Sequence, residues 1–153
     1  MRTRRLMLAP AVAAFFVLAA GPVARGADPA QVQKERLDTM KAINQAMREI
    51  KVYTGKGDFP QVLAAANRVA GLVAKIPSLS PEGSNVGKTR IKPEVWKNFG
   101  HYKELAETSV QAARALAGAA GKKDRAAVAK AFAALGDSCK TCHDPYRLPK
   151  KED

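Results

Sequence analysis

The sequence is poor in aromatic residues, in cysteine and in acidic residues. Aromatic side chains make up only 6% of its 153 residues, so a core must consist mainly of aliphatic side chains and alanine. Two cysteines are too few for a disulfide-rich scaffold. The alternating apolar positions that predict strands are also missing. The 14 acidic residues stand against 26 basic ones, and a net charge of +12 raises nucleic acid as a partner.

Residues 1–26 have the three parts of a secretory signal peptide. Three arginines come first, an apolar run of 15 residues covers 6–20, and a small-residue pattern precedes Ala27. A membrane span needs about 20 apolar residues. We therefore expect cleavage near Gly26 and export to the periplasm, with an uncleaved anchor helix as the alternative. Arg4-Arg5 also fits the twin-arginine export route.

Removal of this signal changes the charge. Four of the 26 basic residues and none of the acidic ones lie in it, so residues 27–153 carry 22 basic against 14 acidic side chains, a net +8. No later apolar run approaches the length of a membrane span, so we expect no stable membrane insertion. The basic residues are scattered over an exported chain, and we expect no nucleic-acid partner.

Residues 27–153 show helical periodicity four times. We expect helices over about 30–52, 58–76, 93–120 and from 124 to the C-terminal region, with one long connection at 77–92. Asp58 and Asp124 have the residue type of helix N-caps. Four amphipathic helices with mostly short loops predict an all-α fold, an antiparallel up-down four-helix bundle. Alanine-rich faces bury little per residue, so a bulky apolar cofactor would stabilise such a bundle.

The last predicted helix ends in Cys139-Lys-Thr-Cys142-His143. This C-x-x-C-H run is the attachment signature of c-type haem. Positions i, i+3 and i+4 of a helix share one face, so both thiols and the imidazole project together. The thiols can form thioether bonds to the haem vinyl groups while His143 reaches the iron. We predict one covalent haem c, with the iron held by His143.

Two other uses of these residues compete with haem. Cys139 and Cys142 could form a disulfide or a thioredoxin-like redox pair, although the latter expects a βαβ context. A zinc site needs four ligands, and His101 would have to join the motif to supply the fourth. His101 lies one residue off the inward face of its helix, which favours an exposed or capping role.

A C-x-x-C-H run at the end of a four-helix bundle, behind a signal peptide, resembles the class II c-type cytochromes, the cytochrome c′ family with its low-spin relatives. Arg36-x-x-x-Met40-x-x-Ile43 is similar to the family's arginine and distal-residue pattern, and the segment Lys92-Pro-Glu-Val-Trp96 is similar to the start of its third helix. The resemblance covers residues 27–150 and implies a homodimer through the first two helices.

The C-terminal end both matches the family and departs from it. Arg147, four residues after His143, resembles the basic residue that follows the family motif. Pro145 is a departure, because proline lacks the N–H that would bond to Thr141 and clashes with that turn. We expect the helix to end or kink there.

Met40 is the candidate for the sixth position of the iron. In an up-down bundle the first and fourth helices are antiparallel neighbours, so the start of one lies level with the end of the other. Met47 lies seven residues further along, roughly 10 Å deeper at about 1.5 Å per residue. The alternative for Met40 is a core methionine packed on the haem.

Arg36 lies one turn before Met40, and we expect it either to pair with a haem propionate or to be a solvated helix charge. Trp96 and Phe99 should lie at the height of the haem, where filling the core is the simpler role for each.

The sequence favours a soluble, non-enzymatic one-electron carrier, with an acidic redox protein as its partner. The alternative is a five-coordinate, high-spin cytochrome c′ that binds nitric oxide or carbon monoxide.

Overall fold

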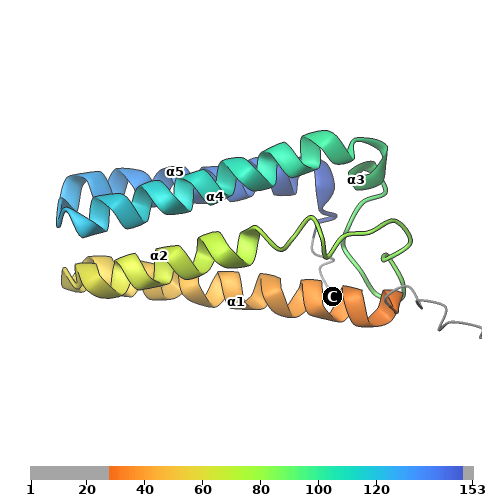
Figure 1. Ribbon diagram of the computed structural model, residues 1–153, viewed down its shortest axis with the longest axis horizontal. Helices are drawn as coiled ribbons and strands as arrows, with labels where there is room; N and C mark the ends of the chain where they lie inside the picture. The colour runs from red at the N-terminus through yellow and green to blue at the C-terminus, as the bar shows by residue number, and fades with distance from the viewer. Residues whose placement is uncertain (1–27, 150–153) are drawn as a thin grey trace, which may run out of the picture.

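The computed structural model describes residues 28–149, and the expected signal peptide lies outside them. The elements in chain order are α1 (Pro29–Lys56), α2 (Phe59–Val73), the single turn α3 (Glu94–Lys97), α4 (Phe99–Gly121) and α5 (Arg125–Tyr146). Figure 1 shows α1 and α2 lying side by side in one layer and α4 and α5 in the other. The four long helices form the antiparallel bundle that the sequence predicts, and the described residues contain no strand.

Local signals end and start the helices at one end of the bundle. Gly57 closes α1 in the left-handed conformation, with φ of 72°, which glycine adopts without steric cost. Asp58 accepts a hydrogen bond from the backbone N–H of Gln61, at 3.3 Å. Asp124 does the same for Ala127, at 2.9 Å. Both predicted N-caps are therefore confirmed.

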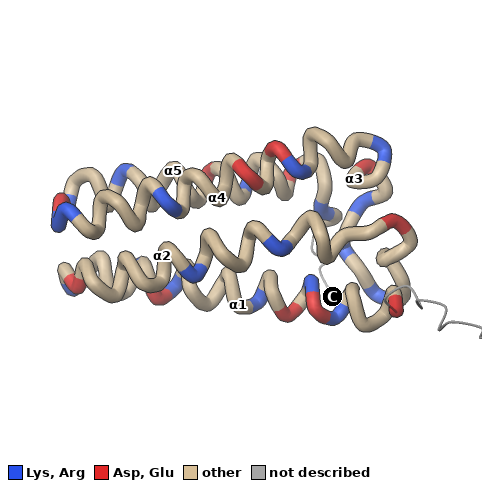
Figure 2. The backbone as a smooth tube through the Cα atoms, viewed as in Figure 1, with Lys and Arg blue, Asp and Glu red and all other residues tan. Residues whose placement is uncertain are grey.

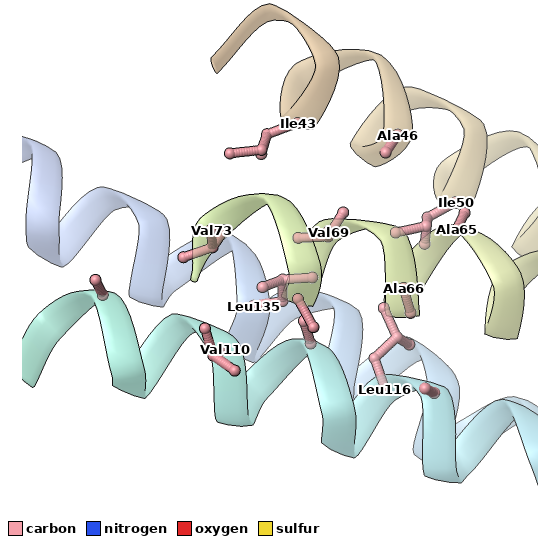
Figure 3. Close-up of a cluster of buried hydrophobic side chains, with 14 of the residues drawn as sticks. Ile43, Ala46, Ile50, Ala65, Ala66, Val69, Val73, Val110, Leu116 and Leu135 are labelled. Carbon is pink, nitrogen blue, oxygen red and sulfur yellow. The ribbon is translucent and has the colours of Figure 1, made fainter. Parts of the chain in front are cut away.

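The core is built from alanine and branched aliphatic residues. Figure 3 shows side chains from all four long helices converging between the layers. Ile50, Leu116 and Leu135 are fully buried there. The alanines at 46, 66 and 113 are fully buried as well, which lets the helices approach closely. No helix among residues 28–149 is long and apolar enough to cross a membrane.

Three helix boundaries differ from the sequence prediction. The first helix passes residue 52 and ends at Lys56, because only Gly57 adopts the left-handed cap. The second ends at Val73 and continues as turns. The third is broken at Asn98, whose backbone leaves the helical region at φ −138° and ψ 55°.

Pro145 does not stop α5 at once. The helix ends at Tyr146, one residue later, and the backbone N–H of Arg147 donates to the carbonyl of His143 at 2.9 Å. The missing N–H of Pro145 falls in the last turn, where a helix can lose one hydrogen bond without breaking.

Candidate haem site

A cavity of about 700 Å³ lies between α1 and α5. Its lining residues belong to the end of the bundle where α1 begins and α5 ends (Figure 1). This volume is within the range of about 300–1,000 Å³ that is usual for ligand pockets. α1 and α5 form its two long walls, Tyr102 of α4 contributes to its side, and residues 89–91 of the long connection close one end. The pair α1–α5 is the most loosely packed pair of neighbouring long helices, because the cavity separates them.

The motif residues of α5 all face this cavity. Cys139, Cys142 and His143 line it together, as their helical spacing predicts. Burial raises the pKa of both thiols, that of Cys142 to about 11. Burial and the neighbouring charges of Arg147 and Arg90 lower the pKa of His143. The imidazole is therefore neutral at pH 7, the form in which histidine binds a metal.

The opposite wall comes from α1 and carries two methionines. Met40 and Met47 both line the cavity, and both are partly buried. Ile43 lies between them on the same face and is buried. The structure thus places Met40 in the same cavity as His143, and it adds Met47 to the wall.

Arg36 has contacts that neither sequence interpretation describes. It is only 4% exposed, so it is not a solvated helix charge. Its Nη1 donates to the carbonyl of Leu79 and to Oγ of Ser84, each at 2.8 Å, and its Nη2 donates to the carbonyl of Ser84 at 2.9 Å. Arg36 therefore fastens the long connection to α1. Its pairing with a propionate stays a prediction.

The aromatic residues divide between the cavity wall and its support. Trp96 and Phe99 do not line the cavity, and the Trp96 indole N–H donates to the carbonyl of Ser80 at 3.1 Å. The wall instead holds Tyr102, whose hydroxyl lies 3.2 Å from Oγ of Ser80, and Tyr146. Tyr102 lies one turn beyond Asn98, so the break before α4 changes which aromatic residues face the cavity.

His101 is exposed, as predicted, and lies outside the cavity wall. Its Nδ1 is 2.8 Å from the hydroxyl of Tyr146, which couples α4 to the last turn of α5. Among residues 28–149 no cluster of three or more metal-binding side chains is present, so the zinc site is not supported. The two cysteine sulfurs are not bonded to each other.

A short segment closes the cavity beside His143, and sequence reasoning missed it. Ile91 and Arg147 form an isolated antiparallel bridge. The N–H of Lys92 donates to the carbonyl of Tyr146 at 2.9 Å, and the N–H of Leu148 donates to the carbonyl of Arg90 at 2.7 Å. We call residues 89–92, paired with 146–148, the strap. A lone bridge of this kind leaves no alternating pattern in the sequence.

The residues of the cavity fit a haem attached to α5. Two thiols and a neutral imidazole lie on one helix face, and apolar side chains and basic residues make up most of the remaining wall. Gly136, one turn before Cys139, also lines the cavity, and a Cβ added there would meet nothing within 4 Å. Glycine inside a helix costs about 0.5–1 kcal/mol relative to alanine. Because Gly136 has no side chain, a flat ligand can lie close to the backbone of α5 at this position.

A helical bundle with a C-x-x-C-H run opening into an internal cavity defines a c-type cytochrome of the bundle class. The family model of cytochrome c′ matches residues 31–147. The chain is 34% identical over 148 residues to cytochrome c′ of Rhodospirillum rubrum, covering 94% of this chain and 98% of that protein. It is 34% identical over 122 residues to cytochrome c-556 of Agrobacterium tumefaciens, covering 76% and 97%.

The solved structures agree. A cytochrome c′ structure with 34% identity superposes with a TM-score of 0.75 over 81% of this chain and 99% of that one. The chain therefore belongs to the cytochrome c′ family. It is a monohaem c-type cytochrome, and its cofactor is a covalently attached haem c.

Proposed function

We propose that this cytochrome is a one-electron carrier in which Cys139 and Cys142 hold the haem, His143 is the proximal ligand and Met40 is the sixth ligand. The observation that carries the proposal is the position of Met40 on α1, across the cavity from the motif helix. A thioether is a suitable axial ligand for haem iron, and it raises the reduction potential. The protein would catalyse no bond chemistry.

When bound, the haem supplies Fe(III)/Fe(II) chemistry, and the chain's own residues control its surroundings. His143, with its lowered pKa, offers a neutral nitrogen. Buried Ile43 and the ring of Tyr102 exclude water from two sides of the cavity. A dry, rigid site lowers the reorganisation that accompanies a change of charge, which suits electron transfer.

A second function has its own support. A variant of cytochrome c′ from Alcaligenes xylosoxidans, 26% identical to this chain, has been solved in its ferrous form with nitric oxide bound. If Met40 only packs on the haem, the iron of this chain would be five-coordinate and high-spin. The apolar wall would then admit nitric oxide or carbon monoxide.

The optical spectrum of the purified holoprotein separates the two functions. We expect low-spin bands in both oxidation states and slow binding of carbon monoxide, because a ligand already occupies the sixth position. Met40→Ala should convert the spectrum to high-spin and make carbon monoxide binding fast.

Met47→Ala is the matched control, because Met47 lines the same cavity from the same helix. It should leave the low-spin spectrum in place. High-spin bands in the unmodified protein would remove the carrier proposal and favour the gas-binding one. A spectral change in Met47→Ala alone would move the sixth ligand to Met47.

We further propose export to the periplasm with cleavage near Gly26, and assembly as a homodimer through α1 and α2. The tripartite pattern of residues 1–26 supports export. The structure of the cytochrome c′ relative with a TM-score of 0.75 is described as having a ligand-controlled dimer dissociation. N-terminal sequencing of the protein made in a bacterial host and its sedimentation behaviour would test the two proposals.

A further inference from the structure

Two arginines that are not paired with an acidic residue of the described chain share the wall of the cavity beside His143. Arg90 comes from the strap and Arg147 from the end of α5, and both line the cavity. The bridge between Ile91 and Arg147 holds the two segments together. Two guanidinium groups repel each other at close range. The pKa of Arg147 is accordingly lowered, first by partial burial and then by the charge of Arg90.

The Arg90 guanidinium is held in a fixed position. Its Nε and Nη2 both donate to the carbonyl of Leu148, at 2.9 and 2.6 Å. The N–H of Leu148 returns a hydrogen bond to the carbonyl of Arg90. These contacts leave Nη1 of Arg90 available for another acceptor. A pre-positioned arginine fork is suited to carboxylate and phosphate groups.

The acidic residues near the cavity are already paired with lysines. Asp144, the one acidic residue in the cavity wall, bonds to Lys140, and Asp38 bonds to Lys41. Within residues 28–149 no carboxylate lies within salt-bridge distance of Arg90 or Arg147. The two arginines therefore form a positively charged spot that no acidic side chain of the described chain neutralises.

Arg36, the arginine that the sequence suggested for a propionate, is engaged elsewhere. Both of its terminal nitrogens donate to the connection at Leu79 and Ser84. Arg36 also lines the cavity, but it is only 4% exposed and three of its N–H groups are taken by the connection. In the described part of the chain, Arg90 keeps Nη1 free of any hydrogen bond and no side-chain hydrogen bond of Arg147 is present, so a cofactor with carboxylate groups would meet these two arginines first.

We propose that Arg90, braced by the strap and acting beside Arg147, binds a carboxylate group of the haem. In this proposal the strap positions Arg90, because it pairs the segment that carries Arg90 with the end of α5 that follows His143. The inference rests on haem attachment to α5. It does not depend on whether Met40 ligates the iron, so the spin-state test above cannot decide it.

The test measures the holoprotein and its Arg90→Gln variant by potentiometric titration and by resonance Raman spectroscopy of the haem carboxylate bands. Loss of a positive charge beside the haem favours the ferric iron. At a fixed potential we expect the ferric-to-ferrous ratio of the variant to rise about threefold or more, which corresponds to about 30 mV at 59 mV per tenfold. We also expect the carboxylate bands to shift.

Three variants make the result specific. Arg114→Gln, an equal charge change at an exposed position of α4, should alter neither readout. Arg90→Lys should restore the potential but not the carboxylate bands, because lysine keeps the charge and loses the fork. If Arg90→Gln does not mature with haem, Arg147→Gln is measured with the same two expectations.

Several results would overturn the proposal. One is an Arg90→Gln protein that matches Arg114→Gln in both readouts. Another is a shifted potential with unchanged carboxylate bands, since Arg90 would then act only as a remote charge. In a last experiment, inorganic phosphate is added to the unmodified holoprotein at constant ionic strength, and the reduction potential is measured. A saturable shift of the potential that Arg90→Gln abolishes would identify a site for anions from solution instead.

Discussion

Arg36 shows how one buried cation fastens a long connection to a helix. Three hydrogen bonds from its guanidinium satisfy a serine hydroxyl and two backbone carbonyls of residues 79–84. Ser80 and Ser84, at 0% and 1% exposed, are buried by the same arrangement. The connection then supports the cavity wall through Tyr102.

The first prediction follows from these bonds. Arg36→Ala should lower the free energy of unfolding by about 3 kcal/mol, because it leaves buried carbonyls without donors. Urea unfolding of the holoprotein measures this. Arg114→Ala, at an exposed position, should change it by less than about 0.5 kcal/mol. An equal effect of the two substitutions would show that the connection does not depend on Arg36.

Asp38 gives a prediction about pH. Hydrogen bonds from Lys34 and Lys41 lower the pKa of its carboxyl from 3.8 to about 2. The pKa is lower in the folded state, so the stabilisation is present above about pH 4 and is lost as the pH falls through about 2. NMR titration of the Asp38 carboxyl carbon should give a midpoint near 2. Lys34→Gln should move that midpoint upward, and an unchanged midpoint would contradict the pairing.

Among the helices, α5 carries the C-x-x-C-H motif and α1 provides the facing wall of the cavity. The motif residues occupy one face of α5, and Gly136 extends that face by one turn without adding a side chain. The break at Asn98 and the strap then position the other residues of the wall, among them Tyr102 after the break and Arg90 in the strap.

Gly136 and Gly118 allow a matched test of the α5 surface. A Cβ at either glycine would meet nothing within 4 Å, but only Gly136 lines the cavity. Gly136→Leu should lower the free energy of unfolding of the holoprotein by about 1–3 kcal/mol, because the side chain competes with the haem for space.

Gly118→Leu should leave the free energy of unfolding of the holoprotein unchanged or raise it by up to about 1 kcal/mol, since leucine has a higher helix propensity than glycine. Thermal or urea unfolding followed by the haem absorbance measures both variants. Similar values for the two leucine variants would mean that the haem does not approach α5 at Gly136.

Over the molecule as a whole, the positive charge is spread across the bundle. Figure 2 shows lysine and arginine spread over α1, α4 and α5 with acidic residues among them, whereas α2 carries Arg68 as its one charged residue. Lys34, Lys41 and Lys140 are paired with neighbouring aspartates. The net charge of +8 that we expect for the mature chain is therefore spread over the surface and not gathered in one patch. Spread charge of one sign produces a long-range electrostatic field, which steers encounters with acidic partners.

This field predicts how electron exchange depends on salt. The second-order rate constant with an acidic redox protein should fall about tenfold between about 0.01 M and about 0.15 M salt, as the Debye length shortens from about 30 to about 8 Å. Stopped-flow absorbance of the haem measures the rate. A basic redox protein should show the opposite trend, and a rate that does not respond to salt would leave the charge without a role in docking.

Much of the fold could be predicted because its signals are local. Asp58 and Asp124 cap helices through bonds to residues three positions away, and the C-x-x-C-H spacing places its side chains on one face by helical geometry alone. The break at Asn98 could not be predicted in this way. It is tied to contacts of the Trp96 indole with Ser80 and of the Tyr146 hydroxyl with the Asn98 carbonyl, between residues far apart in the sequence.

Local sequence signals alone specify the class of fold and the cofactor, and they predict the residues that attach it, because helix periodicity, N-caps and the haem motif act over a few residues. Long-range packing set the rest of the cavity wall. It buries Arg36 against the connection and joins Arg90 to Arg147 through the strap. It also places Trp96 against Ser80 and outside the cavity wall. The hydrogen bonds of Arg36 to Leu79 and of Arg90 to Leu148 join residues 43 and 58 positions apart. Closing loops of that length costs conformational entropy, and only the packing of the whole chain repays it.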